Sequence, residues 1–231
     1  MVAMQPIWTY SAVFIAFLYA IRDTMTFAVL RAVFELLVML LKVKVHGFLI
    51  QGRVWSLADL IESRVDKNPY TVQIITAEDG DVTTLGMIDM DANRIANWGK
   101  DELKLQQKNT VCLMMHNKPG FVSFWYGMLK IGVSTAMLNT NTTGKSFLHS
   151  VRVSVAMSDH KVVVIDDELR GTLSSEIEEL EREGVNVISW SSLLSSVALF
   201  SSTRPPRSCR SLVKEDDPAL FIFTSGTTGA V

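Results

Sequence analysis

Apolar runs alternate with amphipathic segments through the middle of the chain, and this alternation constrains the fold more than any other feature. The runs are rich in aliphatic and β-branched residues, as buried strands are. They cover residues 110–115, 133–138, 161–166 and 185–189. The segments between them carry apolar residues at helical spacing, over residues 121–131, 145–155 and 173–183. Repeated strand–helix alternation predicts an α/β fold, with a mostly parallel sheet and helices on both faces.

Other elements are predicted on the amino-terminal side of this region. Ser56 is a suitable N-cap for a helix over residues 54–61. Residues 70–76 and 82–85, joined by a turn sequence containing Gly80, predict a β-hairpin. Residues 89–103 show helical periodicity. The apolar residues of that helix expected to reach the core are Met90, Ile95, Ala96 and Trp98.

A further apolar run, Leu220 to Phe223, breaks into a loop of hydroxyl residues and glycines. The run predicts a strand that is buried on both faces. The loop consists of Thr224, Ser225, Gly226, Thr227, Thr228 and Gly229. Glycines let backbone N–H groups turn toward an anion and hydroxyls donate further hydrogen bonds, so the loop is a predicted phosphate site. The alternative is an ordinary surface turn, and the Walker pattern is excluded because its glycine spacing and lysine are lacking.

This loop resembles the first signature of the adenylate-forming enzymes, the acyl- and aryl-CoA synthetase superfamily. The family sequence then continues to Pro and Lys, whereas this chain has Ala230 and Val231. A second block resembles one branch, the fatty acid transport proteins or very-long-chain acyl-CoA synthetases. That block covers residues 116–132, 136–141 and 146–150. Its Trp125 and Asn139 regions are interpreted as core and turn, not as site residues.

The resemblance implies ATP-dependent activation of a long- or very-long-chain fatty acid, coupled to its uptake. In that family ATP with magnesium gives an acyl-adenylate and pyrophosphate, and coenzyme A then replaces AMP. Residues 224–229 would wrap the phosphates, and no catalytic residue or metal ligand is assigned. Because relatives carry their adenine, ribose and magnesium sites beyond this loop, residues 47–231 are expected to be an incomplete AMP-binding domain, inactive alone. The alternative is a non-catalytic membrane-bound module that binds a full-length relative or a lipid.

The first 46 residues are predicted to be a membrane-associating helical segment. Two apolar stretches cover residues 7–21 and 24–41, the second containing Arg31 and Glu35 at a spacing that allows pairing. Lys42 and Lys44 follow, which predicts that the rest of the chain faces the cytoplasm. A helix packed on a soluble core is the alternative. Spanning and surface-bound arrangements both stay open, as do plasma membrane, endoplasmic reticulum and peroxisome.

Composition excludes several other functions. The net charge of −2 and the scattered Lys and Arg residues argue against a nucleic-acid partner. Cys112 and Cys209 lie far apart and indicate a reducing compartment, while the four histidines lack zinc-ligand spacing.

Two charged groups are interpreted as solvated. The glutamates of residues 176–183 are expected on the wet face of a helix. Residues 201–211 are expected to be a flexible connector. Its arginines, Arg204, Arg207 and Arg210, could meet anions, but a solvated loop is the favoured interpretation.

Overall fold

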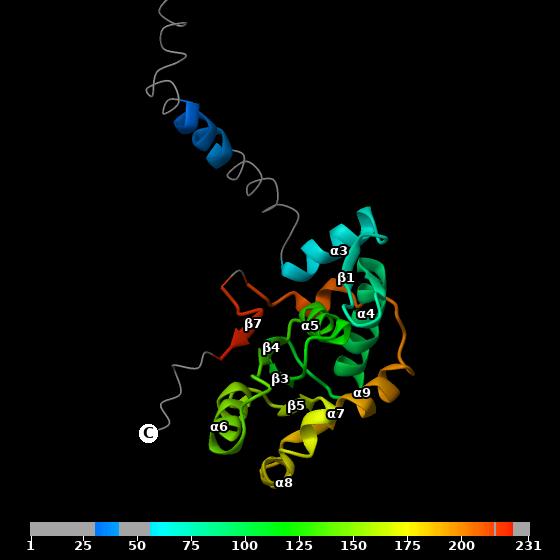
Figure 1. Ribbon diagram of the computed structural model, residues 1–231, viewed down its shortest axis with the longest axis vertical. Coiled ribbons are helices and arrows are strands. Elements are labelled where there is room, and N and C mark those ends of the chain that lie inside the picture. Colours follow the sequence, from blue (N-terminus) through cyan, green and yellow to red (C-terminus); the bar gives the residue numbers. More distant parts are fainter. Residues whose placement is uncertain (1–30, 42–55, 215, 224–231) are drawn as a thin grey trace, which may run out of the picture. The chain divides into compact units, whose positions relative to one another are not determined.

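The structure is a computed structural model that describes residues 31–41, 56–214 and 216–223 (Figure 1). The chain separates into two compact units, Met1–Val54 and Trp55–Val231. The loop of residues 224–229 and most of the predicted membrane-associating segment lie outside the described residues.

Residues 31–41 of the first unit form a helix. The predicted pair is confirmed, because Arg31 Nε lies 2.9 Å from Glu35 Oε1. Large apolar side chains along this helix are exposed; they are Val33, Phe34, Leu36, Leu37, Met39, Leu40 and Leu41. Among the helices that the structure describes, none has the length and apolarity needed to cross a membrane.

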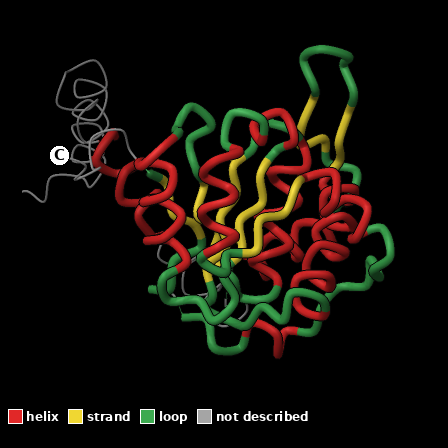
Figure 2. Tube along the Cα trace, turned by 90° about the horizontal axis from the view of Figure 1, so that it is seen from below, coloured by secondary structure: helices red, strands yellow, loops and turns green. Residues whose placement is uncertain are grey.

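A five-stranded parallel sheet forms the centre of the second unit, as predicted. Its strands are β3 (Thr110–Met114), β4 (Ser134–Met137), β5 (Val162–Ile165), β6 (Asn186–Ser189) and β7 (Leu220–Ile222). They lie in the order β6-β5-β3-β4-β7. In register, Cys112 of β3 is opposite Ala136 of β4 and Val163 of β5. The central strands are buried because helices cover both faces (Figure 2).

The two faces of the sheet carry different helices. On one face, Val111 and Leu113 pack with α4 (Leu85–Asp101), α5 (Pro119–Lys130) and α9 (Trp190–Val197). On the other face, Cys112 and Met114 pack with α6 (Gly144–Val155) and α8 (Ser174–Arg182). This division follows from the two-residue period of strand side chains. The helices α5, α6 and α8 were predicted, whereas α7 (Asp167–Arg170), α9 and the 3-10 turn η1 (Arg207–Arg210) were not.

The amino-terminal elements of the second unit largely match the prediction. The helix α3 (Leu57–Lys67) is capped by Ser56, whose Oγ accepts a hydrogen bond from Asp59 N. The strands β1 (Val72–Ile75) and β2 (Val82–Thr84) pair antiparallel, and Gly80 takes a φ of 75° in the turn between them. The hairpin is therefore confirmed.

The helix α4 begins earlier than predicted, directly after β2. Thr84 ends the strand and caps the helix, since its hydroxyl accepts a hydrogen bond from Met87 N. Ile95, Ala96 and Trp98 are buried as expected, but Met90 is 48% exposed because it lies on the opposite side of the helix. The prediction for Met90 was wrong.

Candidate functional site

The carboxyl ends of the five parallel strands meet at one edge of the sheet, and polar residues gather there. His116 and Lys118 follow β3, and Asp166 and Glu168 follow β5. The helices after these neighbouring strands, α5 and α8, pack on opposite faces of the sheet. Such a reversal is a topological switch point, the place where open α/β sheets commonly bind ligands.

The strand that precedes the predicted phosphate loop in the sequence ends at this same edge. The strand β7 pairs parallel with β4, with Ala136 opposite Phe221 and Met137 opposite Ile222. Phe223, the last described residue, packs partly against the α6–α8 core. Residues 224–229 follow directly in the sequence and lie outside the described residues. Their role in phosphate binding therefore stays a prediction.

The prediction that this strand is buried on both faces was wrong. Phe221 is 41% exposed and Ile222 is 70% exposed. The reason is position: within the described part of the chain, β7 is the last strand of the sheet and pairs only with β4. An apolar run indicates a strand but does not determine whether the strand is central or at an edge.

Four charged or titratable side chains form a cluster at the switch point. Lys118 Nζ lies 2.9 Å from Asp166 Oδ2 and 3.3 Å from Glu168 Oε1. His116 Nδ1 lies 3.4 Å from Asp166 Oδ2. Burial alone would raise the pKa of Asp166, but the hydrogen bond and charge of Lys118, with a smaller contribution from His116, lower it. Asp166 is therefore a buried carboxylate that holds a cationic partner at the carboxyl edge.

This cluster has the composition of a metal site but already contains a cation. Ligand atoms of His116, Asp166 and Glu168 all lie within 4.8 Å of one another. The ammonium of Lys118 contacts both carboxylates and supplies the positive charge that a metal ion would bring. The sequence could not reveal this group, because His116 and Asp166 are 50 residues apart. The absence of a zinc site stays a prediction.

The residues after β4 form a turn, as was predicted for the Asn139 region. Asn139 Oδ1 accepts a hydrogen bond from Asn141 N at 2.9 Å, which closes an Asx turn. Gly144 then begins α6, and its N–H donates to Glu176 Oε1 at 2.7 Å. Glu176 thus caps a helix, and Glu178 and Glu181 lie on the predicted exposed face of α8. Glu179 and Glu183 instead pair with Arg152 of α6.

A hollow lies between α4, α5 and α9. Its volume is about 190 Å³, and its lining includes Ile95, Gly120, Trp190 and Leu194. Sites for drug-sized ligands usually enclose roughly 300–1,000 Å³. The hollow is therefore too small to be the main ligand site. A Cβ added at Gly120 would lie 2.3 Å from the Trp190 ring, so this glycine is needed for α9 to pack on α5.

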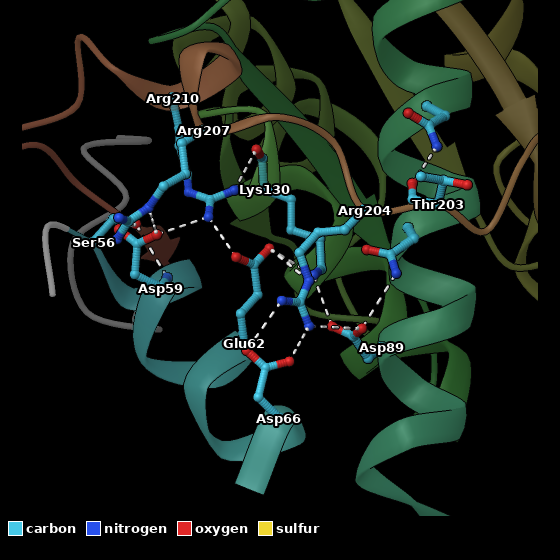
Figure 3. Close-up of polar contacts among 12 residues, drawn as sticks. Ser56, Asp59, Glu62, Asp66, Asp89, Lys130, Thr203, Arg204, Arg207 and Arg210 are labelled. Carbon is cyan, nitrogen blue, oxygen red and sulfur yellow. Dashed lines mark hydrogen bonds and ion pairs between the residues drawn. The ribbon is translucent and has the colours of Figure 1, made fainter. Parts of the chain in front are cut away.

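The arginine-bearing connector is not the solvated loop that was predicted. Arg210 is 3% exposed and donates to Asp59 and Glu62 of α3, while Arg207 also contacts Asp59 (Figure 3). Arg204 lies 3.0 Å from Asp66. The prediction of a solvated loop was wrong because the carboxylates of α3 pair with these arginines. Sequence spacing offered one signal, since residues 59, 62 and 66 share a face of α3.

This network changes the ionisation of Asp59. Burial would raise its pKa, but hydrogen bonds from Arg207 and Arg210 outweigh burial and lower the pKa to about 2. Lys130, at the end of α5, extends the network, with Nζ 2.9 Å from Glu62 and 2.7 Å from Asp89. The network lies near the start of β4, at the sheet edge opposite the candidate site.

Comparison with known proteins finds a family match over most of the second unit. A family model described as "AMP-binding enzyme" matches residues 61–230. Long-chain fatty acid transport protein 2 of Rattus norvegicus is 36% identical over 155 residues, which are 63% of this chain and 24% of that protein. Long-chain fatty acid transport protein 6 of Homo sapiens is 28% identical over 206 residues, 85% of this chain and 32% of that protein. The chain thus spans between a quarter and a third of the length of these curated relatives.

Solved structures share the fold. The inhibitor-bound amino-terminal domain of FACL13 from Mycobacterium tuberculosis matches with a TM-score of 0.65 and 20% identity, over 77% of this chain and 43% of that chain. ATP-bound MatB from Rhodopseudomonas palustris matches with a TM-score of 0.57 and 24% identity, over 74% of this chain and 33% of that chain. At these identities the likeness concerns the architecture of sheet and helices.

Proposed function

Because this chain belongs to the family of AMP-binding enzymes, we propose that its loop of residues 224–229 binds the phosphates of ATP in the activation of a long-chain fatty acid. The observation that carries the proposal is the place of β7. This strand runs parallel to β4 and its carboxyl end lies at the edge where α/β sheets bind ligands, and residues 224–229 follow shortly after it in the sequence. The fatty acid substrate is proposed from the printed names of the relatives.

In the proposed reaction the fatty acid is its own nucleophile. A carboxylate oxygen attacks the α-phosphorus of ATP, the bond to the β,γ-phosphates breaks, and acyl-adenylate and pyrophosphate result. The sulfur of coenzyme A then attacks the acyl carbon, and AMP leaves. The four hydroxyl groups of Thr224, Ser225, Thr227 and Thr228, together with backbone N–H groups, are the donors that would stabilise charge on the departing pyrophosphate.

The chemistry of these donors fits a phosphate group. The loop offers hydroxyl and amide hydrogens, and it contains no carboxylate that would repel an anion. A magnesium ion bound with ATP would supply positive charge for the phosphates, and no residue of this chain is assigned as its ligand. The loop's role is to bind and orient the phosphates.

Binding of ATP by the full chain tests the proposal directly. Isothermal titration is expected to detect ATP binding that a Ser225→Ala, Thr227→Ala, Thr228→Ala triple variant weakens by at least about tenfold, since hydrogen bonds to charged groups contribute roughly 1.5–3 kcal/mol each. Thr172→Ala is the matched control, because Thr172 is exposed and far from the loop in sequence. Equal ATP affinity in the triple variant and the wild type would refute the proposal.

We also propose that the amino-terminal segment associates with a membrane. The support is the helix of residues 31–41, along which large apolar side chains are exposed. In flotation with neutral phosphatidylcholine vesicles, the wild type should float, whereas a Leu36→Asp, Leu40→Asp variant should float several-fold less. Leu199→Asp is the control, since Leu199 is 87% exposed in the second unit. Unchanged flotation of the double variant would exclude this segment as the contact.

The two experiments together separate the catalytic proposal from its alternative. Vesicle binding without ATP binding would favour the non-catalytic membrane-bound module. ATP binding without vesicle binding would favour a nucleotide-binding protein that is not held at a bilayer by this segment.

A further inference from the structure

Arg210 occupies a buried position between three elements that are distant in sequence. Its Nη2 donates to Asp59 Oδ1 at 2.7 Å and to Glu62 Oε2 at 2.5 Å, both on α3. Its Nη1 donates to the carbonyl oxygen of Lys130 at 3.2 Å, at the end of α5. Figure 3 shows this guanidinium between the carboxylates of α3 and the end of α5. One side chain therefore ties the connector to α3 and α5 together.

The charges around Arg210 are balanced and largely removed from water. Glu62 and Asp89 are each 8% exposed, and both contact Lys130, which is 1% exposed. A buried ion pair is costly to break, because the partner left behind is a buried charge without compensation. If the connector moved and carried Arg210 away from α3, Glu62 Oε2 would lose the cation that pairs with it. The connector is consequently held in place at this point.

Further contacts anchor the chain between Arg210 and β7. They occur at short intervals along residues 208–219 and connect this stretch to the segment 107–134. They are Gln107 Nε2 to Ser208 O, Leu212 N to Gln107 Oε1, Lys108 Nζ to Asp217, Ser134 Oγ to Pro218 O, and Trp125 Nε1 to Ala219 O. The connector thus reaches β4 at a defined position, with Leu220 opposite Thr135.

The strand β7 has little ability to set its own register. It contains three residues, and its exposed Phe221 and Ile222 contribute little burial to hold it in place. A slip of one residue along β4 would move the following loop by about 3.3 Å and turn each side chain to the opposite face. Contacts before the strand therefore contribute to the register, together with the partly buried Phe223 that follows it.

We propose that Arg210 is a positioning residue: by holding the connector on α3 and α5, it helps to determine the register of β7 on β4, the strand after which residues 224–229 follow in the sequence. This inference rests on the proposed phosphate-binding function only for its consequence. The structural part concerns β7 alone. Arg210 lies at the sheet edge where β7 begins, and the loop follows the opposite end of the strand, so the residue acts through the strand.

Hydrogen exchange of the full 231-residue chain without nucleotide tests the inference. In Arg210→Met, exchange of peptides covering residues 216–223 should rise at least about tenfold, while peptides covering β5 and β6 should change less than about twofold, because sub-global openings involve only the elements that lose contacts. Arg182→Met is the matched control, since Arg182 is exposed on α8 and its Nε donates to the carbonyl of Glu178 in the same helix.

Arg210→Lys serves as the second variant, in case Arg210→Met does not fold. It keeps the charge but replaces the planar fork by one ammonium group that cannot reach α3 and the Lys130 carbonyl in the same geometry. Local loss of protection over residues 216–223 in either folded variant supports the inference. An equal rise of exchange in all five strands, or wild-type protection of residues 216–223 in Arg210→Lys, would overturn it. Because no ATP is present, failure of the proposed function leaves this outcome unaffected.

Discussion

Replacing Lys130 by Met tests how strongly the buried charges hold the second unit together. Lys130 is 1% exposed, and its ammonium lies 2.9 Å from Glu62 Oε1 and 2.7 Å from Asp89 Oδ1. At an effective dielectric constant of about 20, a unit charge pair at such a distance is attracted by roughly 6 kcal/mol. Much of each attraction offsets the cost of burying the charges, so the net loss is smaller than the sum.

We expect Lys130→Met to lower the free energy of unfolding by about 3–5 kcal/mol, the usual cost of removing one partner from a buried ion pair. Methionine fills the apolar space of the lysine stem, so the loss reports on charge more than on volume. Urea unfolding followed by tryptophan fluorescence measures it. Lys100→Met is the control, because Lys100 pairs with Asp101 at the surface and should lose less than about 1 kcal/mol.

A second substitution tests whether unpaired buried charge causes the loss of stability. Adding Asp89→Asn to Lys130→Met removes one of the two carboxylates left without the ammonium, while Glu62 keeps Arg210. The double variant should therefore recover part of the lost stability. A loss below about 1 kcal/mol in Lys130→Met would contradict the assigned strength of the pair. Further destabilisation by Asp89→Asn in that background would show that unpaired charge is not the cause.

Three further outcomes follow from single residues. Asp59 has a folded pKa of about 2, below its unfolded value of about 3.9, so its stabilising contribution is complete above pH 5 and lost as the pH falls toward 2; urea unfolding midpoints of Asp59→Asn should depend less on pH between 5 and 3 than those of the wild type, and equal slopes would contradict this. Gly120→Ala should cost about 1–3 kcal/mol in the same assay, because the new Cβ meets an indole carbon at 2.3 Å, whereas Gly171→Ala, with no atom within 4 Å, should be near neutral; equal effects would argue against tight packing of α9. Burial raises the pKa of the Cys112 thiol to about 12, so a thiol reagent should label Cys209 first and reach Cys112 only on unfolding; rapid labelling of both would contradict the buried position.

Much of the fold could be predicted from the sequence because its signals are local. Apolar periodicity located β3 to β6 and the helices α5, α6 and α8. Ser56 marked a helix start through its capping hydroxyl, and Pro119 marked another through its fixed φ. Elements with weak signals were missed. The helix α9 is serine-rich, and the short α7 offers one turn, so neither shows a persuasive apolar period. The position of β7 at the edge depends on strand order, which no run of residues encodes.

The sequence by itself determined the strand–helix alternation, the glycine and hydroxyl loop, and through these the membership of the AMP-binding family. Each depends on residues that are neighbours in the chain. Only the tertiary structure decided which charges meet: Arg210 reaches Asp59 across 151 residues, and His116 reaches Asp166 across 50. The physical reason is that the residues around a charged side chain in the sequence do not identify its distant partner. Its partner is chosen by the packing of helices and strands, which brings distant carboxylates and cations into one buried place.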